Sequence, residues 1–439
     1  MTQSAFDALS AACGVGILSS SAQYTPRGRW ILTAIGVAGA ALYLAVALVA
    51  MRRFMSFAFI RSLDDTPDEC ADTPNDGFGD DARLAQSSKI ESNTALSSAL
   101  RDFPQVRTVL IAYLALCLCS GFIFFLVAKF SDSSIPAREA ARVGVTLASS
   151  SGLTFAETVP GPAWLIATLS VIVALGWPVW LLASRASKRR SVSAVWKTTA
   201  SFFVFLLVIA LLITILETPI ESRASSRENP QLSGQPFTAR FVRATTQTCA
   251  AVGAGVPSES LDDRAVAAGT QFLLACTTFV GGFPGSPAGG VKWSILLLVV
   301  LAALRRRDPA NTPESRQIIR YAATRLVVSL FLLTLVVTLG ILVIHRLTAS
   351  PYESPPRFTA ALLDASSCVN GANLTAGPAA RIIDPNLSGG IGQPVDQYGY
   401  GVAWLMLAML AGRVIPIWVL ESSAKAAKTP PPASNSLIL

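Results

Sequence analysis

Charged side chains are scarce in this sequence. Asp, Glu, Lys and Arg together make up 14% of its 439 residues, whereas a typical soluble domain has about 25%. Hydrophobic residues make up 52%, and the mean hydropathy is +0.51. A chain with so little charge is too apolar for a soluble globular protein of this size, so we expect the lipid bilayer to be its main solvent.

Side chains for metal binding and catalysis are also few. The one histidine, His345, has no Cys, Asp or Glu at ligand spacing, which makes it a poor metal candidate. The seven Cys residues show neither a CxxC spacing nor a compact disulfide framework, and we interpret them as small apolar fillers. We find no GxGxxG between a predicted strand and helix and no Walker A motif. These absences argue against an enzyme and against a bound cofactor.

What the sequence has instead is a series of long apolar runs. Crossing the hydrocarbon core takes roughly 20 residues. There are about seven such runs. They occur near residues 28–51, 105–129, 161–184, 196–217, 291–304, 318–346 and 398–421. The fifth, 291–304, is preceded by an interrupted apolar stretch that begins at residue 266. The chain is therefore predicted to be an all-α integral membrane protein.

Lys and Arg collect at the ends of these runs, at 52–53, 185–197 and 305–307. Cytoplasmic loops close to membrane spans carry an excess of these residues, so we expect all three clusters to face the cytoplasm. This places the N-terminus on the outer side and the C-terminus in the cytoplasm of a multi-pass protein of the cell (inner) membrane. The formal charge of +8 follows from this topology and does not indicate nucleic-acid binding.

Four short amphipathic segments lie in the outer loops, and each is too short to cross the bilayer. They end in small residues and Gly, at Cys13–Gly16, Ser149–Gly152, Ala250–Gly253 and Cys368–Gly371. A spanning run follows each segment, and one also precedes the last three. The pattern predicts a degenerate repeat of span, half-helix, Gly turn and span.

Such short, Gly-interrupted segments are typical of re-entrant backbone, which is tolerated at membrane depth only inside protein or beside a water-filled cavity. A half-helix entering from outside points its partially negative C-terminal end at the membrane centre and so favours a cation there. The Gly that follows allows the backbone to aim its carbonyls at an axis. A single such Gly is more typical of a helix C-cap or a tight turn, but four copies in phase favour a pore for K⁺.

Residues 279–292 read Phe-Val-Gly-Gly-Phe-Pro-Gly-Ser-Pro-Ala-Gly-Gly-Val-Lys, with apolar sequence on both sides. Each Gly costs a helix about 1 kcal/mol and each Pro about 3 kcal/mol, so the fifth span must break within the membrane. The freed N–H and C=O groups must line the pathway or pack inside the bundle. We expect this loop to lie below the carbonyl rings and to act as a gate.

The stretch from Gly281 to Lys292 is similar to the GG-x-PGS-x-AGG-[IV]-K loop of the TrkH/KtrB (Trk/Ktr) family, in the superfamily of K⁺ transporters. Gly412-Arg413 resembles the GR motif of the family's last span, and Gly176-Trp177-Pro178-Val179 resembles its G-F-P-V stretch. The resemblance covers nearly the whole chain, and the loop is its most specific part. It implies four pseudo-repeats of span, pore loop and span around a central pore, with about seven full spans and four re-entrant pore helices.

The resemblance also implies which residues form the ion site. The selectivity filter, which would bind K⁺ by backbone carbonyls only, comprises Cys13, Gly14, Val15, Gly16, Ser150, Ser151, Gly152, Ala251, Val252, Gly253, Val369, Asn370 and Gly371. Its four filter glycines would be Gly16, Gly152, Gly253 and Gly371. The gate comprises Gly281, Gly282, Pro284, Gly285, Ser286, Gly289, Gly290, Lys292 and Arg413.

Two of the gate residues are cationic. Arg413 lies well inside a span, so we expect it to pair with the freed carbonyls of the Gly-rich loop, as part of the gate or as a purely structural clamp. Lys292 either lies at the gate or extends its ammonium group to the cytoplasm.

Two features depart from the family pattern. The family's first repeat begins with a span, whereas this sequence begins with the half-helix. Either the start has been placed too late, or another subunit supplies the missing helix, or the first repeat is weakened. The third filter reads Cys249-Ala250-Ala251-Val252-Gly253 where the family often has an R-T-A-G-F type of sequence, which leaves selectivity for K⁺ over Na⁺ open.

We therefore predict uptake of K⁺, or of both Na⁺ and K⁺, by a homodimer that works with a separate cytoplasmic nucleotide-binding subunit of the TrkA/KtrA type, as the resemblance implies. A non-conducting structural subunit of a membrane complex is the alternative, and the potassium subunit of a P-type ATPase complex is a third hypothesis that the loop disfavours. The predicted organisation is repeat 1 at 1–53, a polar cytoplasmic linker at 54–104, repeat 2 at 105–190, repeat 3 at 191–310 with the gate loop at 281–290, repeat 4 at 311–424 and a cytoplasmic tail at 425–439.

Overall fold

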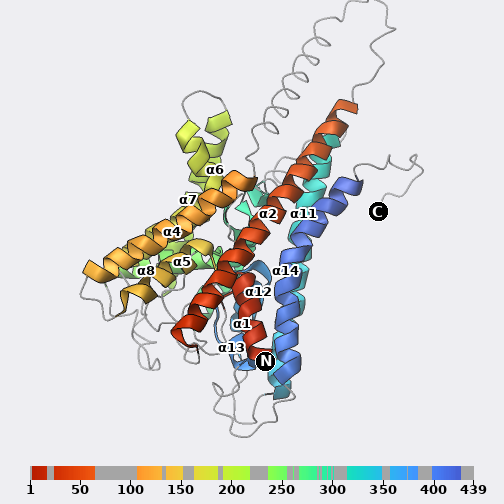
Figure 1. Cartoon of the computed structure of the whole chain (residues 1–439). Coiled ribbons are helices and arrows are strands. Elements are labelled where there is room, and N and C mark those ends of the chain that lie inside the picture. Colours follow the sequence, from red (N-terminus) through yellow and green to blue (C-terminus); the bar gives the residue numbers. More distant parts are fainter. Residues whose placement is uncertain are drawn as a thin grey trace, which may run out of the picture.

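The computed structural model is helical almost throughout (Figure 1). It describes residues 2–16, 24–64, 106–130, 135–151, 163–185, 191–217, 236–254, 261, 266–283, 286, 289–293, 295–297, 300, 314–348, 356–372, 374–383 and 398–426. Gly152, Pro284 and Gly285 of the predicted site lie outside these residues, as do the linker beyond residue 64 and the tail beyond 426.

Long apolar helices form the frame of the molecule. They are α2 (Pro26–Asp64), α4 (Val106–Phe130), α6 (Ala163–Arg185), α7 (Ser191–Leu216), α11 (Glu314–Thr348) and α14 (Tyr398–Ala426). Five of them contain stretches long and apolar enough to cross a membrane, at 26–50, 106–130, 196–216, 321–347 and 400–423. The sixth, α6, is interrupted at Gly176, which has φ 65° and ψ 177°. The chain is thus a multi-pass membrane protein.

Half-helices pack against this frame. They are α1 (Thr2–Ala12), α5 (Ala137–Ser149), α8 (Phe237–Ala251) and α12 (Phe358–Asn370), with 11, 13, 15 and 13 residues. A helix rises about 1.5 Å per residue, so none of them can cross the hydrocarbon core. Each contacts a long helix next to it in sequence, in the pairs α1–α2, α4–α5, α7–α8 and α11–α12. A further short helix, α13 (Pro378–Ile383), follows α12.

The fifth apolar run is broken where the Gly-rich sequence predicts a break. Helix α9 (Ala268–Phe279) ends at the start of the loop, and the backbone continues as strand β1 (Val280–Gly281). Strand β2 (Val291–Lys292) closes the loop by pairing in parallel with β1, Val280 opposite Val291. This pairing satisfies some of the backbone groups that the broken helix leaves free.

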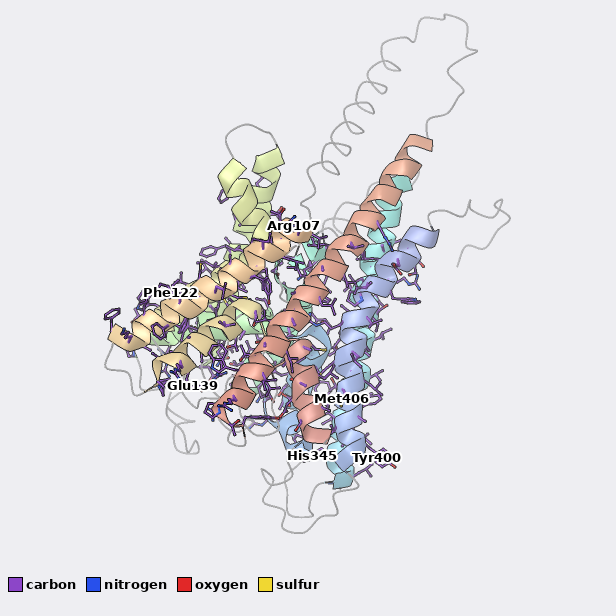
Figure 2. The ribbon with its side chains drawn as sticks, in the orientation of Figure 1. Arg107, Phe122, Glu139, His345, Tyr400 and Met406 are labelled. Carbon is purple, nitrogen blue, oxygen red and sulfur yellow. The ribbon has the colours of Figure 1, made fainter. Side chains whose placement is uncertain are left out.

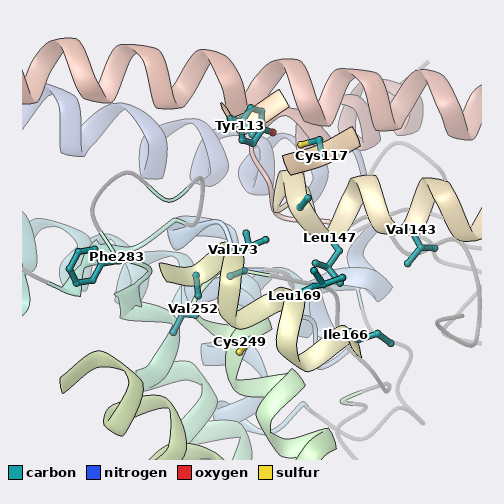
Figure 3. Close-up of a cluster of buried hydrophobic side chains, with 14 of the residues drawn as sticks. Tyr113, Cys117, Val143, Leu147, Ile166, Leu169, Val173, Cys249, Val252 and Phe283 are labelled. Atoms are coloured by element: carbon teal, nitrogen blue, oxygen red, sulfur yellow. The ribbon is translucent and has the colours of Figure 1, made fainter. Parts of the chain in front are cut away.

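The packed interior and the lipid-facing surface separate clearly. Figure 3 shows one buried cluster in which Leu147 of α5, Val173 of α6 and Val252 after α8 pack together with Phe283 of the loop. On the outside, Phe122 of α4 is 61% exposed and Tyr400 of α14 is 82% exposed (Figure 2). Large apolar side chains at such exposure are expected of helices that face hydrocarbon.

One buried and two partly exposed charged side chains join the first two repeats. Arg142 of α5 is fully buried, and its Nε donates to Glu139 Oε2 over 2.8 Å. Glu139, labelled in Figure 2, also lies 3.9 Å from the guanidinium of Arg29 on α2. Pairing is what makes charge tolerable away from water, so this network fixes α5 against the start of α2.

One helix is longer than the sequence indicates. We expected repeat 1 to end at residue 53 and a polar linker to follow, but α2 continues to Asp64. The segment from Phe54 to Leu63 is largely apolar and has no Gly or Pro, so nothing in it stops the helix.

Candidate functional site

Each half-helix ends at a residue with left-handed backbone geometry. These corner residues are Gly14, Ser150, Gly253 and Gly371, with φ of 65°, 55°, 76° and 63°. In each repeat the residue after the corner donates its N–H to the carbonyl five residues back: Val15 to Ser10, Ser151 to Thr146, Ala254 to Cys249 and Ala372 to Ser367, over 2.9 to 3.3 Å. All four half-helices therefore end in the same Schellman-type turn.

This geometry corrects the alignment of the repeats. We expected Gly16 and Gly152 to be the equivalents of Gly253 and Gly371. By backbone geometry the equivalent residues are Gly14 and Ser150, each two residues earlier in the chain. Small residues surround every corner, so the sequence pattern alone does not fix the phase. Two residues beyond the corners the sequence reads Gly16, Gly152, Gly255 and Asn373. Gly16 also has a positive φ, of 70°, and the other three lie outside the described residues.

Three corners meet around Arg413 of α14. Its Nε donates to the Cys13 carbonyl over 2.8 Å, and its Nη2 contacts the same oxygen. A Cβ built on Gly14 would lie 2.8 Å from the Ser150 carbonyl oxygen and 2.9 Å from Arg413 Nη2. A Cβ on Gly371 would lie 2.2 Å from the same nitrogen. The corners of repeats 1, 2 and 4 thus share one small space with a guanidinium group.

Among the described residues, Arg413 pairs with the carbonyl of Cys13. We expected the freed carbonyls of the Gly-rich loop as its partners; the described residues of the loop show no such bond, and residues 284, 285, 287 and 288 lie outside the described residues. Two neighbours place it there. Gly412 allows α12 to approach so closely that a Cβ would lie 1.9 Å from the Val369 carbonyl oxygen, and the ring of Tyr43 lies 4.4 Å from the guanidinium carbon.

The Gly-rich loop packs directly beneath the fourth corner. A Cβ on Gly289 would lie 1.5 Å from the carbonyl oxygen of Asn370, so the contact requires Gly at position 289. The ammonium of Lys292 donates to the Ser286 carbonyl over 3.0 Å. Lys292 therefore bonds within the loop, and together with the β1–β2 pairing it holds the loop closed.

The loop is fixed to α6 through a backbone bond that the sequence explains. The Phe283 N–H donates to the Ala174 carbonyl over 2.9 Å. In a regular helix that carbonyl would accept the N–H of residue 178, but residue 178 is Pro and has none. The Gly176-Trp177-Pro178-Val179 motif thus frees an acceptor for the loop.

The third corner belongs to a different part of the site. Cys249, Val252 and Ala254 pack in the same buried cluster as the loop residue Phe283 and residues of α5 (Figure 3). Among the described residues, no hydrogen bond joins this corner to Arg413. The predicted filter residues Ala251 and Gly253 are buried at the end of α8 as expected of a corner.

Unpaired oxygens also lie at the corners. Ser150 Oγ and Asn370 Oδ1 are buried and have no hydrogen-bond partner among the described residues. Buried polar atoms are nearly always paired with protein, water or an ion. In the described part of the chain no group of three or more His, Cys, Asp or Glu side chains could hold a metal ion, so any cation here would meet carbonyl, hydroxyl and amide oxygens.

Comparison with known proteins places the fold. No family model matches the chain. The crystal structure of the potassium transporter TrkH from Vibrio parahaemolyticus aligns with 96% of this chain and 77% of that chain, with a TM-score of 0.57 and 14% identity. The chain has a TrkH-like fold. An uncharacterized cation transporter of Mycoplasma genitalium, MG322, is 26% identical to this chain over 118 residues. The matched part is 27% of this chain and 21% of that protein.

Within the TrkH-like fold, sequence reasoning missed two carboxylates. Asp7 of α1 and Asp364 of α12 are both fully buried, and each lies seven residues before its corner, Gly14 or Gly371. Their equal spacing in two of the four repeats was a signal available in the sequence.

Proposed function

We propose that the protein takes up K⁺, or both Na⁺ and K⁺, by permeation through the space between the four corners. The observation that carries the proposal is the meeting of three half-helix C-termini and their carbonyls at one point, where a cationic group, the Arg413 guanidinium, is held by the Cys13 carbonyl. Such helix ends carry partial negative charge. A place that holds a guanidinium is electrostatically suited to a monovalent cation.

The Gly-rich loop is the proposed gate. Gly289 contacts the Asn370 carbonyl, and the loop is closed by the bond from Lys292 to Ser286. Permeation then requires the loop to leave the fourth corner and the guanidinium to leave Cys13. The TrkH-like fold, and a transporter-like relative over 118 residues, support a transporter and not an enzyme.

The proposal includes the assembly and orientation that the sequence suggests. We propose a homodimer in the cell inner membrane, with the N-terminal corner entered from outside and a separate TrkA/KtrA-like nucleotide-binding subunit on the cytoplasmic side. The inward driving force is the membrane potential, about 2.3 kcal/mol per charge for each 100 mV.

Ion flux into vesicles tests the proposal. Purified protein in proteoliposomes should admit radioactive Rb⁺ when a negative internal potential is imposed, and excess external K⁺ should compete. Protein-free liposomes are the control. In cells that lack their own K⁺ uptake systems, the protein should restore growth at low K⁺.

The alternative function is a non-conducting structural subunit. The bond between Arg413 and Cys13 favours it, because a guanidinium among the corners blocks the path in the described conformation. Absence of Rb⁺, K⁺ and Na⁺ flux from well-folded protein, together with failure to restore growth, would leave this alternative and remove transport.

A further inference from the structure

Asp364 holds the backbone that leaves the fourth corner. Its side chain is fully buried in α12, two helical turns before Gly371. Oδ1 accepts the N–H of Ala376 and Oδ2 accepts the N–H of Ala379, each over 2.6 Å. Hydrogen bonds to an ionised carboxylate are about twice as strong as neutral ones, so these two bonds tie the returning segment firmly to the half-helix.

Ser367 continues this attachment one turn nearer the corner. Its Oγ accepts the N–H of Leu374 over 3.2 Å and donates to the carbonyl of Ala372. Residues three apart lie on the same face of a helix, so Asp364 and Ser367 form a row along α12. Ala372, Leu374, Ala376 and Ala379 of the returning segment are thereby bound to that row through their own backbone groups.

Repeat 1 carries the same pair of residues. Asp7 and Ser10 lie seven and four residues before Gly14, as Asp364 and Ser367 do before Gly371. Asp7 is also fully buried, and its Oδ2 accepts the hydroxyl of Tyr24, beyond the first corner, over 2.5 Å. Repeats 2 and 3 have Val143 and Thr246 at the equivalent position. A carboxylate at this position therefore occurs in the two repeats whose corner residues, Gly14 and Gly371, lie beside Arg413.

We propose that Asp364 is a positioning residue for ion selectivity, and that Asp7 has the same role in repeat 1. The proposal rests on the proposed function. Carbonyl oxygens that replace a hydration shell discriminate between ions by their number, field and spacing, and a segment free to relax adapts to a smaller ion. Through its bonds to Ala376 and Ala379, the Asp364 carboxylate restrains the backbone that follows the fourth corner, and so the corner itself.

The test compares two carboxylate-to-amide variants. Asp364→Asn keeps the size of the side chain but turns one acceptor into an NH₂ group that faces a backbone N–H. Glu217→Gln is the matched control, because Glu217 is also buried, at 8% exposure, and accepts the Ala267 N–H and the Thr270 hydroxyl at the start of α9. Both variants remove one buried charge, but only the first touches a corner.

Two measurements are made on each variant and on the unchanged protein. Hydrogen exchange at the Ala376 and Ala379 amides should be faster in Asp364→Asn by about tenfold or more. A hydrogen bond to a charged acceptor contributes at least about 1.4 kcal/mol, and this energy corresponds to a tenfold change in rate. The ratio of Rb⁺ to Na⁺ flux in proteoliposomes should fall for Asp364→Asn and for Asp7→Asn. It should stay unchanged for Glu217→Gln.

The outcomes separate the inference from the proposed function. If the unchanged protein conducts no cation, the proposed function fails, and unchanged exchange at 376 and 379 in Asp364→Asn would overturn the attachment itself. If the protein conducts and Asp364→Asn keeps the Rb⁺ to Na⁺ ratio despite faster exchange, the carboxylate is structural only and the inference is wrong. Equal loss of selectivity in Glu217→Gln would also overturn it.

Discussion

Ser150 is the corner residue whose side chain does not suit its backbone. It is the non-glycine residue with positive φ in the described structure, at 55°, and left-handed geometry costs an L-residue about 1–2 kcal/mol. Ser150→Gly should therefore raise the free energy of unfolding by up to about 1 kcal/mol, after the greater chain entropy of Gly is counted. Thermal unfolding in detergent measures this.

Ser149→Gly is the matched control for that prediction. Ser149 is the last residue of α5, where helical geometry prevails, so Gly should lower stability by up to about 1 kcal/mol. Stabilisation by both changes, or by neither, would show that the geometry at Ser150 carries no strain.

Arg413 lies on the proposed path, at the carbonyl of Cys13. Arg413→Gln should raise Rb⁺ uptake by about three- to tenfold, where tenfold corresponds to about 1.4 kcal/mol of barrier, because a cation no longer opposes another cation at the Cys13 carbonyl. Arg325→Gln is the control. Arg325 belongs to α11, and its guanidinium carbon lies 5.1 Å from the centre of the Trp418 ring on α14. Equal uptake by both variants would contradict a role for Arg413 in the path.

Gly289 is the residue whose replacement most directly displaces the loop. A Cβ there would lie 1.5 Å from the Asn370 oxygen, so Gly289→Ala should lower stability by about 1–3 kcal/mol, as overpacking does. Gly269→Ala is the control, because a Cβ at Gly269 meets nothing nearer than Leu216 at 3.7 Å. Similar unfolding temperatures for the two variants would argue against the close contact.

At the scale of elements, the break in α6 and the attachment of the Gly-rich loop to α6 depend on the same backbone carbonyl, that of Ala174. Pro178→Ala adds an N–H that competes with Phe283 for the Ala174 carbonyl, so exchange at the Phe283 amide should become faster. Pro136→Ala, before the first turn of α5, is the control and should leave that amide unchanged. An unaltered Phe283 amide in Pro178→Ala would show that Gly176 alone frees the carbonyl.

The elements themselves were largely predictable from the sequence. Apolar length predicted the five helices that are long enough to cross a membrane, although it suggested about seven spans, and short segments ending at Gly predicted the half-helices. Both depend on local composition. The interruption after Phe279 followed from the density of Gly and Pro. The phase of the corners did not follow, since Gly14 and Gly16 are equally good turn residues and only the hydrogen bond from Val15 to Ser10 distinguishes them.

The hydrogen-bond partners of Arg413 and Asp364 were harder to predict than the helices that carry them. Arg413 was recognised as unusual because a guanidinium inside a span needs a partner, but its acceptor at Cys13 comes from the other end of the chain. Asp364 could have been recognised by its equal spacing with Asp7. Its acceptor role depends on where the returning segment passes, and the sequence does not specify that path.

At the scale of the whole molecule, the orientation in the membrane is open to a direct test. In a background without the seven native cysteines, a cysteine at Arg53 should react with an impermeant maleimide only from the cytoplasmic side. A cysteine at Arg27, at the other end of the same span, should react only from outside. Both positions are exposed. The reverse pattern would invert the proposed direction of transport.

The contact between Arg413 and Cys13 joins residues 400 positions apart. During synthesis, the carbonyl end of the first half-helix therefore meets the guanidinium only after α14 has been made. A ribosome that stops early releases a product whose first corner has no α14 beside it. Assembly of the three-corner meeting point thus requires α14, and products that end before Arg413 lack it.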